Sequence, residues 1–165
     1  MKRILLSALL MGCIVPAASA TGSLLNQKNL SLNIADKLAQ NALLVCARDS
    51  YNVAVTVVDR SGTVLVMKRM DNAGPHAIEA SRMKAFTALS TKNSTDNVMK
   101  NSLSSPEASG LRDVPGFLLL AGGIPVKAGE QVTGAIGVGG APGGHLDQAC
   151  AREALNSIDK ELNAG

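Results

Sequence analysis

A glycine-rich stretch near the carboxyl end of the chain, residues 122–147, constrains the fold most strongly. Short apolar runs at 124–126 and 131–138 predict two strands, and the turn between them contains Gly129, which is typical of a β-hairpin. The second strand leads into glycine-rich residues 137–144, and a helix is predicted from His145. Because glycine has no Cβ, these positions either admit a ligand or another backbone, or only turn the chain tightly.

Four of these glycines stand next to the predicted helix start and form the first part of a candidate binding site: Gly139, Gly140, Gly143 and Gly144. Backbone N–H groups at the positive end of a helix favour an anion, so we expect an acidic ligand here. A phosphate loop does not fit, because His145 and Leu146 stand where Lys and Ser or Thr are required. Too little chain follows for a dinucleotide-binding unit, so no nucleotide cofactor is predicted.

The remaining elements are predicted from apolar periodicity and turn residues. Helices are expected over 31–48, 75–90 and 145–162, and strands over 53–59, 63–69 and, as a third short apolar strand, 117–121. The polar segment 92–106 has room for one short helix, and 104–116 reads as an irregular exposed loop. The order of the elements and the two hairpins predict one layered α+β domain around an antiparallel sheet.

The amino terminus has the pattern of a secretory signal peptide over residues 1–20, which leaves residues 21–165 as the domain. Lys2 and Arg3 precede an apolar stretch, and an A-x-A site ends at Ala20. This predicts a periplasmic or secreted protein with no transmembrane span. In an alternative reading, 10–13 is a lipoprotein box, and Cys13 would carry a lipid anchor.

Charge and composition limit the classes of molecule that this protein is expected to bind. The net charge of +3 falls to +1 when Lys2 and Arg3 leave with the signal, and aromatic residues are only 2% of the chain. A nearly neutral chain with few aromatic residues argues against a nucleic-acid binder. Cys46 and Cys150 would enter an oxidising compartment, where they either form a disulfide or stay as two buried thiols.

Two histidines, His76 and His145, limit the metal and acid–base chemistry. His76 and Met83 are seven residues apart on one helix, and imidazole and thioether are both haem or copper ligands. The alternatives are an exposed histidine, a packing methionine and a solvated His145. Lys84 lies in the same helix and either pairs with a carboxylate or is solvated. No C-x-x-C or H-E-x-x-H pattern is present, so zinc is not predicted.

The chain resembles the GlcG/HbpS family of small haem-binding proteins, also called the PduO C-terminal-like domain, over residues 28–162. The family's R-M-D-x-A…E-A-x-x-K-A-x-T-A run matches residues 69–89, and its V-x-V-V-D-x-x-G strand and turn matches 55–62. The other matching segments are GGIPV (122–126), GAIGV (134–138) followed by GAPGG (140–144), and DQACA (147–151).

The resemblance implies a profilin-like, five-stranded antiparallel sheet flanked by helices, homo-oligomers, haem binding and, for some members, haem breakdown. It puts Lys84 and Asp147 at matched positions and His76 in the matched helix start, as the first candidate for iron ligation. Two departures concern the rim of the pocket: Gly139-Gly140 stands where many members have Ser-Gly, and His145 where an acidic residue is common.

Three functions therefore remain open. The first is haem binding, with haem or iron acquisition or haem breakdown as the role. The second is binding or processing of a small carboxylate, as the link of the GlcG name to glycolate genes suggests. The third is a structural oligomer without a ligand. Whether the protein is an enzyme is left open.

Overall fold

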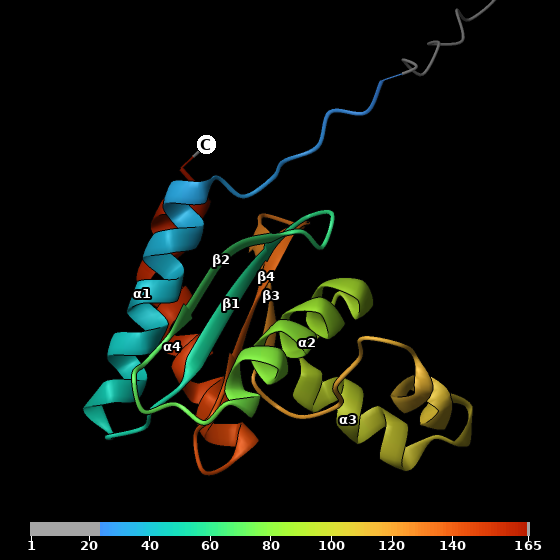
Figure 1. Cartoon of the computed structure of the whole chain (residues 1–165). Helices are drawn as coiled ribbons and strands as arrows, with labels where there is room; N and C mark the ends of the chain where they lie inside the picture. Colours follow the sequence, from blue (N-terminus) through green and yellow to red (C-terminus); the bar gives the residue numbers. More distant parts are fainter. Residues whose placement is uncertain (1–23, 165) are drawn as a thin grey trace, which may run out of the picture.

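The computed structural model describes residues 24–164, so the predicted signal peptide and Cys13 lie outside the described residues. Nine elements follow one another along this part of the chain (Figure 1). They are α1 (Leu32–Arg48), β1 (Ala54–Asp59), β2 (Val64–Arg69), α2 (His76–Thr91), α3 (Thr95–Ser104), the 3₁₀ helix η1 (Pro106–Asp113), β3 (Gly123–Ala128), β4 (Gln131–Gly139) and α4 (Gly144–Leu162).

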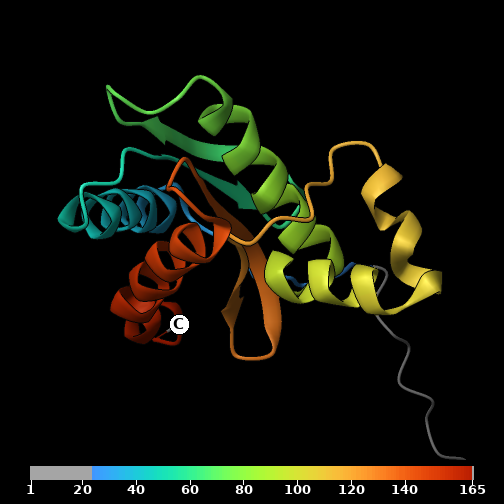
Figure 2. The same ribbon diagram turned by 90° about the horizontal axis from the view of Figure 1, so that it is seen from below.

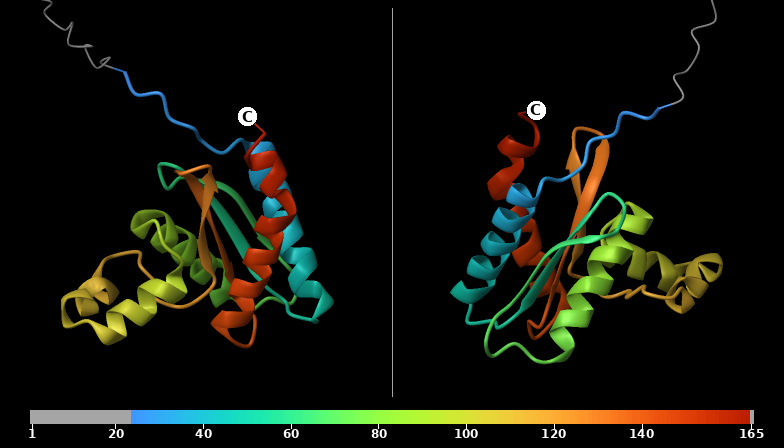
Figure 3. Two further views of the ribbon diagram at one scale, coloured as in Figure 1. Left: turned by 180° about the vertical axis from the view of Figure 1, so that it is seen from behind. Right: turned by 45° about the horizontal axis from the view of Figure 1, so that its top comes forward.

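The strands form one antiparallel sheet in the order β2-β1-β4-β3. Helices α1 and α4 lie side by side on one face and α2 covers the other, as the views in Figure 3 show. The predicted α+β architecture with a helix-flanked antiparallel sheet is therefore confirmed.

Within residues 24–164 the sheet has four strands, so the prediction of five was wrong. Residues 117–121, predicted as a strand, form no ladder. The backbone N–H of Leu118 instead donates to Thr87 Oγ1 at 2.8 Å, and Gly116 has a φ of +83°. The segment is thus held against α2 and not in the sheet. The preceding stretch, predicted as irregular, contains η1, where Pro106 at the first position supplies a suitable φ.

The core has two layers because the central strand β1 is buried on both sides. Val55 and Val57 pack in the cluster between the sheet and the pair α1–α4. Val58 packs with Ala85 in the layer beneath α2. Helices on both faces of the sheet therefore explain why the predicted strand at 53–59 is apolar at nearly every position.

Gly137 marks the place where α2 rests directly on β4. A Cβ on Gly137 would lie 2.1 Å from the backbone oxygen of Ser81 and 2.5 Å from the backbone N of Ala85. At this glycine, therefore, the close neighbour is the backbone of α2. The neighbouring strand β1 is joined to α2 by the hydrogen bond between the side chains of Thr56 and Ser81, whose oxygens are 2.8 Å apart.

Replacing Gly137 by alanine is expected to lower the free energy of unfolding by about 2–3 kcal/mol, because the new methyl group must push α2 away from β4. Chemical denaturation followed by circular dichroism measures the change. Gly110→Ala is the control, since a Cβ there meets no atom within 4 Å. Equal stability of both variants would show that α2 moves without cost.

Candidate functional site

Helices α2 and α4 begin at the same end of the sheet, on opposite faces (Figures 1 and 2). The connecting loop 140–143 passes between the two helix starts, directly after β4. A Cβ on Gly140 would lie 3.3 Å from Ala77 Cβ, and one on Gly144 would lie 2.8 Å from the backbone oxygen of Ala121. The glycines therefore let the loop pack tightly between the two helices and the sheet.

Neither of these two helices has a side-chain cap. Pro75 and Gly143 occupy the capping positions of α2 and α4, and neither residue has a side-chain atom that could accept a hydrogen bond. In α1 and α3, by contrast, the Ser31 and Ser94 side chains accept from backbone N–H groups of the first turn. The capping positions of α2 and α4 thus leave the positive partial charge of these helix starts without a side-chain acceptor, although Glu79 and Asp147 lie in the first turns.

Both histidines are exposed at these two helix starts, His76 on α2 and His145 on α4. Each ring folds back over the glycine two residues earlier. A Cβ on Gly74 would lie 2.7 Å from His76 Cε1, and one on Gly143 would lie 2.8 Å from His145 Cε1. The spacing Gly-x-His thus occurs twice, once at each helix start. The repeat is visible in the sequence, but only the fold shows that its two copies lie at the same end of the sheet.

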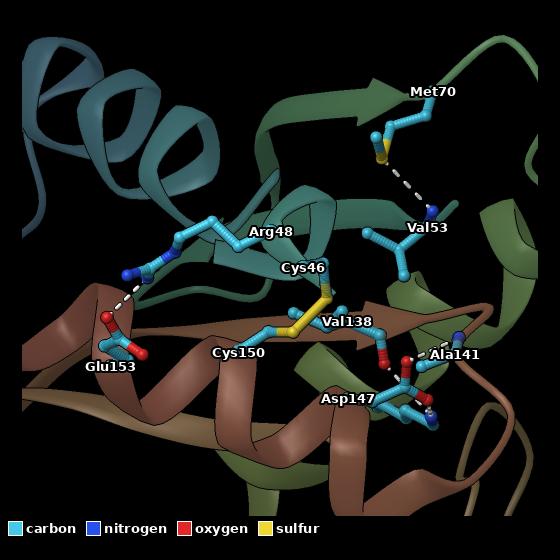
Figure 4. Close-up of a disulfide and its surroundings, with 10 residues drawn as sticks. Cys46, Arg48, Val53, Met70, Val138, Ala141, Asp147, Cys150 and Glu153 are labelled. Carbon is cyan, nitrogen blue, oxygen red and sulfur yellow. Dashed lines mark hydrogen bonds and ion pairs between the residues drawn. A yellow bond between two sulfur atoms is a disulfide. The ribbon is translucent and has the colours of Figure 1, made fainter. Parts of the chain in front are cut away.

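A buried ion pair between Lys84 and Asp147 lies beneath this end and links three elements. Lys84 of α2 is 1% exposed and Asp147 of α4 is 2% exposed. Lys84 Nζ donates to Asp147 Oδ2 at 2.6 Å and to the backbone oxygen of Val138 in β4 at 3.0 Å. Asp147 Oδ1 accepts from the backbone N–H of Ala141 at 3.0 Å, as Figure 4 shows.

Burial raises the pKa of the Asp147 carboxyl above its ordinary value. The charge and hydrogen bond of Lys84, the Ala141 N–H and the charge of His76 each act in the opposite direction.

The predicted site residues therefore divide into two groups. The structure brings His76, His145 and the four glycines to one end of the sheet. Lys84 lies nearby, but its ammonium group is directed at Asp147 and Val138. Met83 is half-buried on α2, about 10 Å from His76 along the helix axis.

Cys46 and Cys150 form a disulfide, which confirms one of the two alternatives for these cysteines. The bond joins α1 to α4, with the two Cα atoms 5.5 Å apart (Figure 4). Cys150 lies three residues after Asp147, so the disulfide holds the first turns of α4 in place. The neighbouring surface ion pair Arg48–Glu153 joins the same two helices.

Comparison with known proteins assigns the fold and the family. The model of the family described as "Haem degrading protein HbpS-like" matches residues 30–156. The chain belongs to this family. The crystal structure of an HbpS double mutant from Streptomyces reticuli is 39% identical, with a TM-score of 0.79, over 89% of this chain and 99% of that one.

Two further relatives extend the comparison. Protein GlcG of Escherichia coli K12 is 30% identical over 94 residues, which are 55% of this chain and 66% of GlcG. A structure described as a PduOC:heme complex has a TM-score of 0.72 and 22% identity, over 79% of this chain and 96% of that one. At this identity the PduOC structure is evidence for a shared fold alone.

Within residues 24–164, no helix combines the length and the apolar character needed to cross a membrane. The same part of the chain contains no group of three or more His, Cys, Asp or Glu side chains placed to hold a metal ion.

Proposed function

We propose that this protein binds haem at the end of the sheet where α2 and α4 begin, with His76 as the ligand to the iron. One observation carries the proposal: two helix starts without side-chain caps, each with an exposed histidine, lie at this end of the sheet. The HbpS-like family, described as haem degrading, supports the same ligand.

The residues at this end match the chemical parts of haem. An imidazole such as that of His76 is a common protein ligand to haem iron. The propionates would accept from those backbone N–H groups in the first turns of α2 and α4 that do not already donate to Gly74 or Gly143, where the helix dipoles favour anions. Ile78 and Leu120 are 37% and 44% exposed and supply apolar surface at this side of the molecule. When bound, haem would supply the redox and oxygen chemistry of its iron.

Export to the periplasm or the outside of the cell is part of the proposal, with a lipid anchor on Cys13 as the alternative. The Cys46–Cys150 disulfide supports it, because such bonds persist mainly in oxidising compartments. We also propose that the protein acts as a homo-oligomer in haem or iron acquisition or haem breakdown.

Haemin titration followed by absorbance tests the proposal. We expect one haem per chain with a Soret band, and His76→Ala should shift this band and weaken binding about tenfold or more, because the iron loses its imidazole ligand. His145→Ala is the matched control, since it removes an imidazole from the other helix start. An unchanged Soret band and affinity in His76→Ala, or no 1:1 binding at all, would contradict the proposal. Decay of the band with ascorbate and oxygen would indicate turnover.

A small carboxylate is a second candidate ligand, because the uncapped starts of α2 and α4 suit any compact anion. Thermal-shift measurements with glycolate and glyoxylate separate this function from the first. The third function, a structural oligomer, would require glycines that serve subunit packing. Gly137 gives it less support, because the backbone of Ser81 within the same chain already accounts for the missing Cβ.

A further inference from the structure

A groove of about 400 Å³ lies between α3, η1 and residues 117–119, and shares no lining residue with the proposed haem site. Figures 1 and 3 show α3 and η1 beside α2, on the side of the molecule opposite α1 and α4. The apolar lining consists of Met99, Leu103 and residues 117–119, and the polar lining consists of Ser102 and Arg112. The volume is within the range of pockets that hold small molecules.

The wall formed by residues 117–119 is fixed by contacts with α2. The ring of Phe117 packs edge-on against Phe86, with ring centroids 6.1 Å apart and an interplanar angle of 72°. The N–H of Leu118 donates to Thr87 Oγ1 at 2.8 Å. The groove therefore has a preformed apolar wall, which lowers the ordering cost of binding an apolar ligand.

Ser102 brings a buried hydroxyl without a partner to this groove. The residue is 4% exposed, and its Oγ has no hydrogen-bond partner within residues 24–164. Helical hydroxyls commonly donate to the carbonyl one turn earlier, as Thr87 and Thr91 do in α2. A buried hydroxyl without a partner is unfavourable, so a ligand oxygen that accepts from Ser102 would remove this penalty.

Arg112 brings a single positive charge to the same groove. Its Nε donates to the backbone oxygen of Ser109 at 3.1 Å, which orients the side chain along η1. Neither Nη1 nor Nη2 of Arg112 has a hydrogen-bond or ion-pair partner among the described residues 24–164. A guanidinium with both terminal amino groups available suits a carboxylate, which it binds through two parallel hydrogen bonds.

We infer that this groove binds an apolar monocarboxylate, an acyl or aryl acid, as a second ligand of the protein. The apolar body lies against Met99, Leu103 and residues 117–119, and the carboxylate pairs with Arg112. A ligand oxygen accepts from Ser102. One cation among largely apolar walls favours a monoacid over a polyanion or a sugar. The inference does not depend on the proposed haem site, because it uses none of its residues.

Isothermal titration of the full chain with decanoate tests the inference, with decanol as the probe that has the same tail and no charge. We expect decanoate to bind at 1:1, and Arg112→Gln to weaken it about tenfold or more while decanol binding stays the same. Ser102→Ala should weaken decanoate binding severalfold. Arg152→Gln is the matched control, an exposed arginine on α4, and should change neither affinity.

Two further measurements locate the ligand. In methyl NMR spectra, decanoate should shift the Met99 signal and leave that of Met67 on β2 in place, because only Met99 lines the groove. Saturation with haemin should leave the decanoate affinity unchanged. No decanoate binding, full binding by Arg112→Gln, or competition by haemin would each overturn the inference. Competition would assign the groove to haem itself, whereas a failed haemin titration leaves this test unaffected.

Discussion

Replacing Lys84 by methionine is expected to lower the free energy of unfolding by about 3–5 kcal/mol, because the Asp147 carboxylate then stays buried without its cation. Both side chains are almost completely excluded from solvent, so water cannot replace the lost partner. The remaining hydrogen bond from Ala141 satisfies only one carboxylate oxygen. Urea denaturation of the purified variants measures the change.

Two comparisons separate the lost charge pair from the lost packing. The double variant Lys84→Met with Asp147→Leu should recover most of the stability, since an apolar pair of similar volume carries no desolvation cost. Lys100→Met removes an exposed ion pair with Asp96 on α3 and should cost less than about 1 kcal/mol. A double variant no more stable than Lys84→Met alone would show that Lys84 acts through its hydrogen bond to Val138, the acceptor in β4.

The ion pair between Lys84 and Asp147 could not be predicted from the sequence. A lysine in an amphipathic helix is usually solvated, and nothing local to Lys84 distinguishes it from Arg82, which does pair with a neighbour at the surface. The partner Asp147 lies 63 residues away and is brought close only by the fold. The family resemblance pointed to both positions but not to their contact.

Some of the strand predictions were confirmed by the structure, and the one at residues 117–121 was not. The apolar run at 53–59 and the turn around Gly129 were sufficient to predict β1 and the hairpin of β3 and β4. Residues 117–121 were equally apolar, yet they form part of a wall beside α2. An apolar run shows that a segment is buried but not whether a neighbouring strand or a helix buries it.

The glycines could be predicted as a group but not assigned one by one. The sequence allowed either a ligand or another backbone near them, and at Gly137 the structure shows the backbone of α2. Near the starts of α2 and α4 the proposal of an acidic ligand stands on the uncapped helix ends instead. In the sequence, the starts of α2 and α4 are distinguished from the other helix starts by their Gly-x-His spacing.

Loss of the Cys46–Cys150 disulfide is expected to lower the free energy of unfolding by about 4 kcal/mol, because the bond closes a loop with a sequence separation of 104 in the unfolded chain. The variant Cys46→Ala with Cys150→Ala, or reduction of the native protein by dithiothreitol, should produce this loss in urea denaturation. Dithiothreitol should leave the double variant unchanged, which controls for other effects of the reagent.

The same change tests how the disulfide supports the proposed site. Cys150 lies in the turn after Asp147, so freeing α4 from α1 should increase amide hydrogen exchange in the first turns of α4 before it does so in β1. The surface contacts Lys37–Glu161, Asn41–Ser157 and Arg48–Glu153 also join α1 to α4. A loss below about 1 kcal/mol would mean that these contacts and the apolar core already hold the two helices together, and that the covalent link adds little.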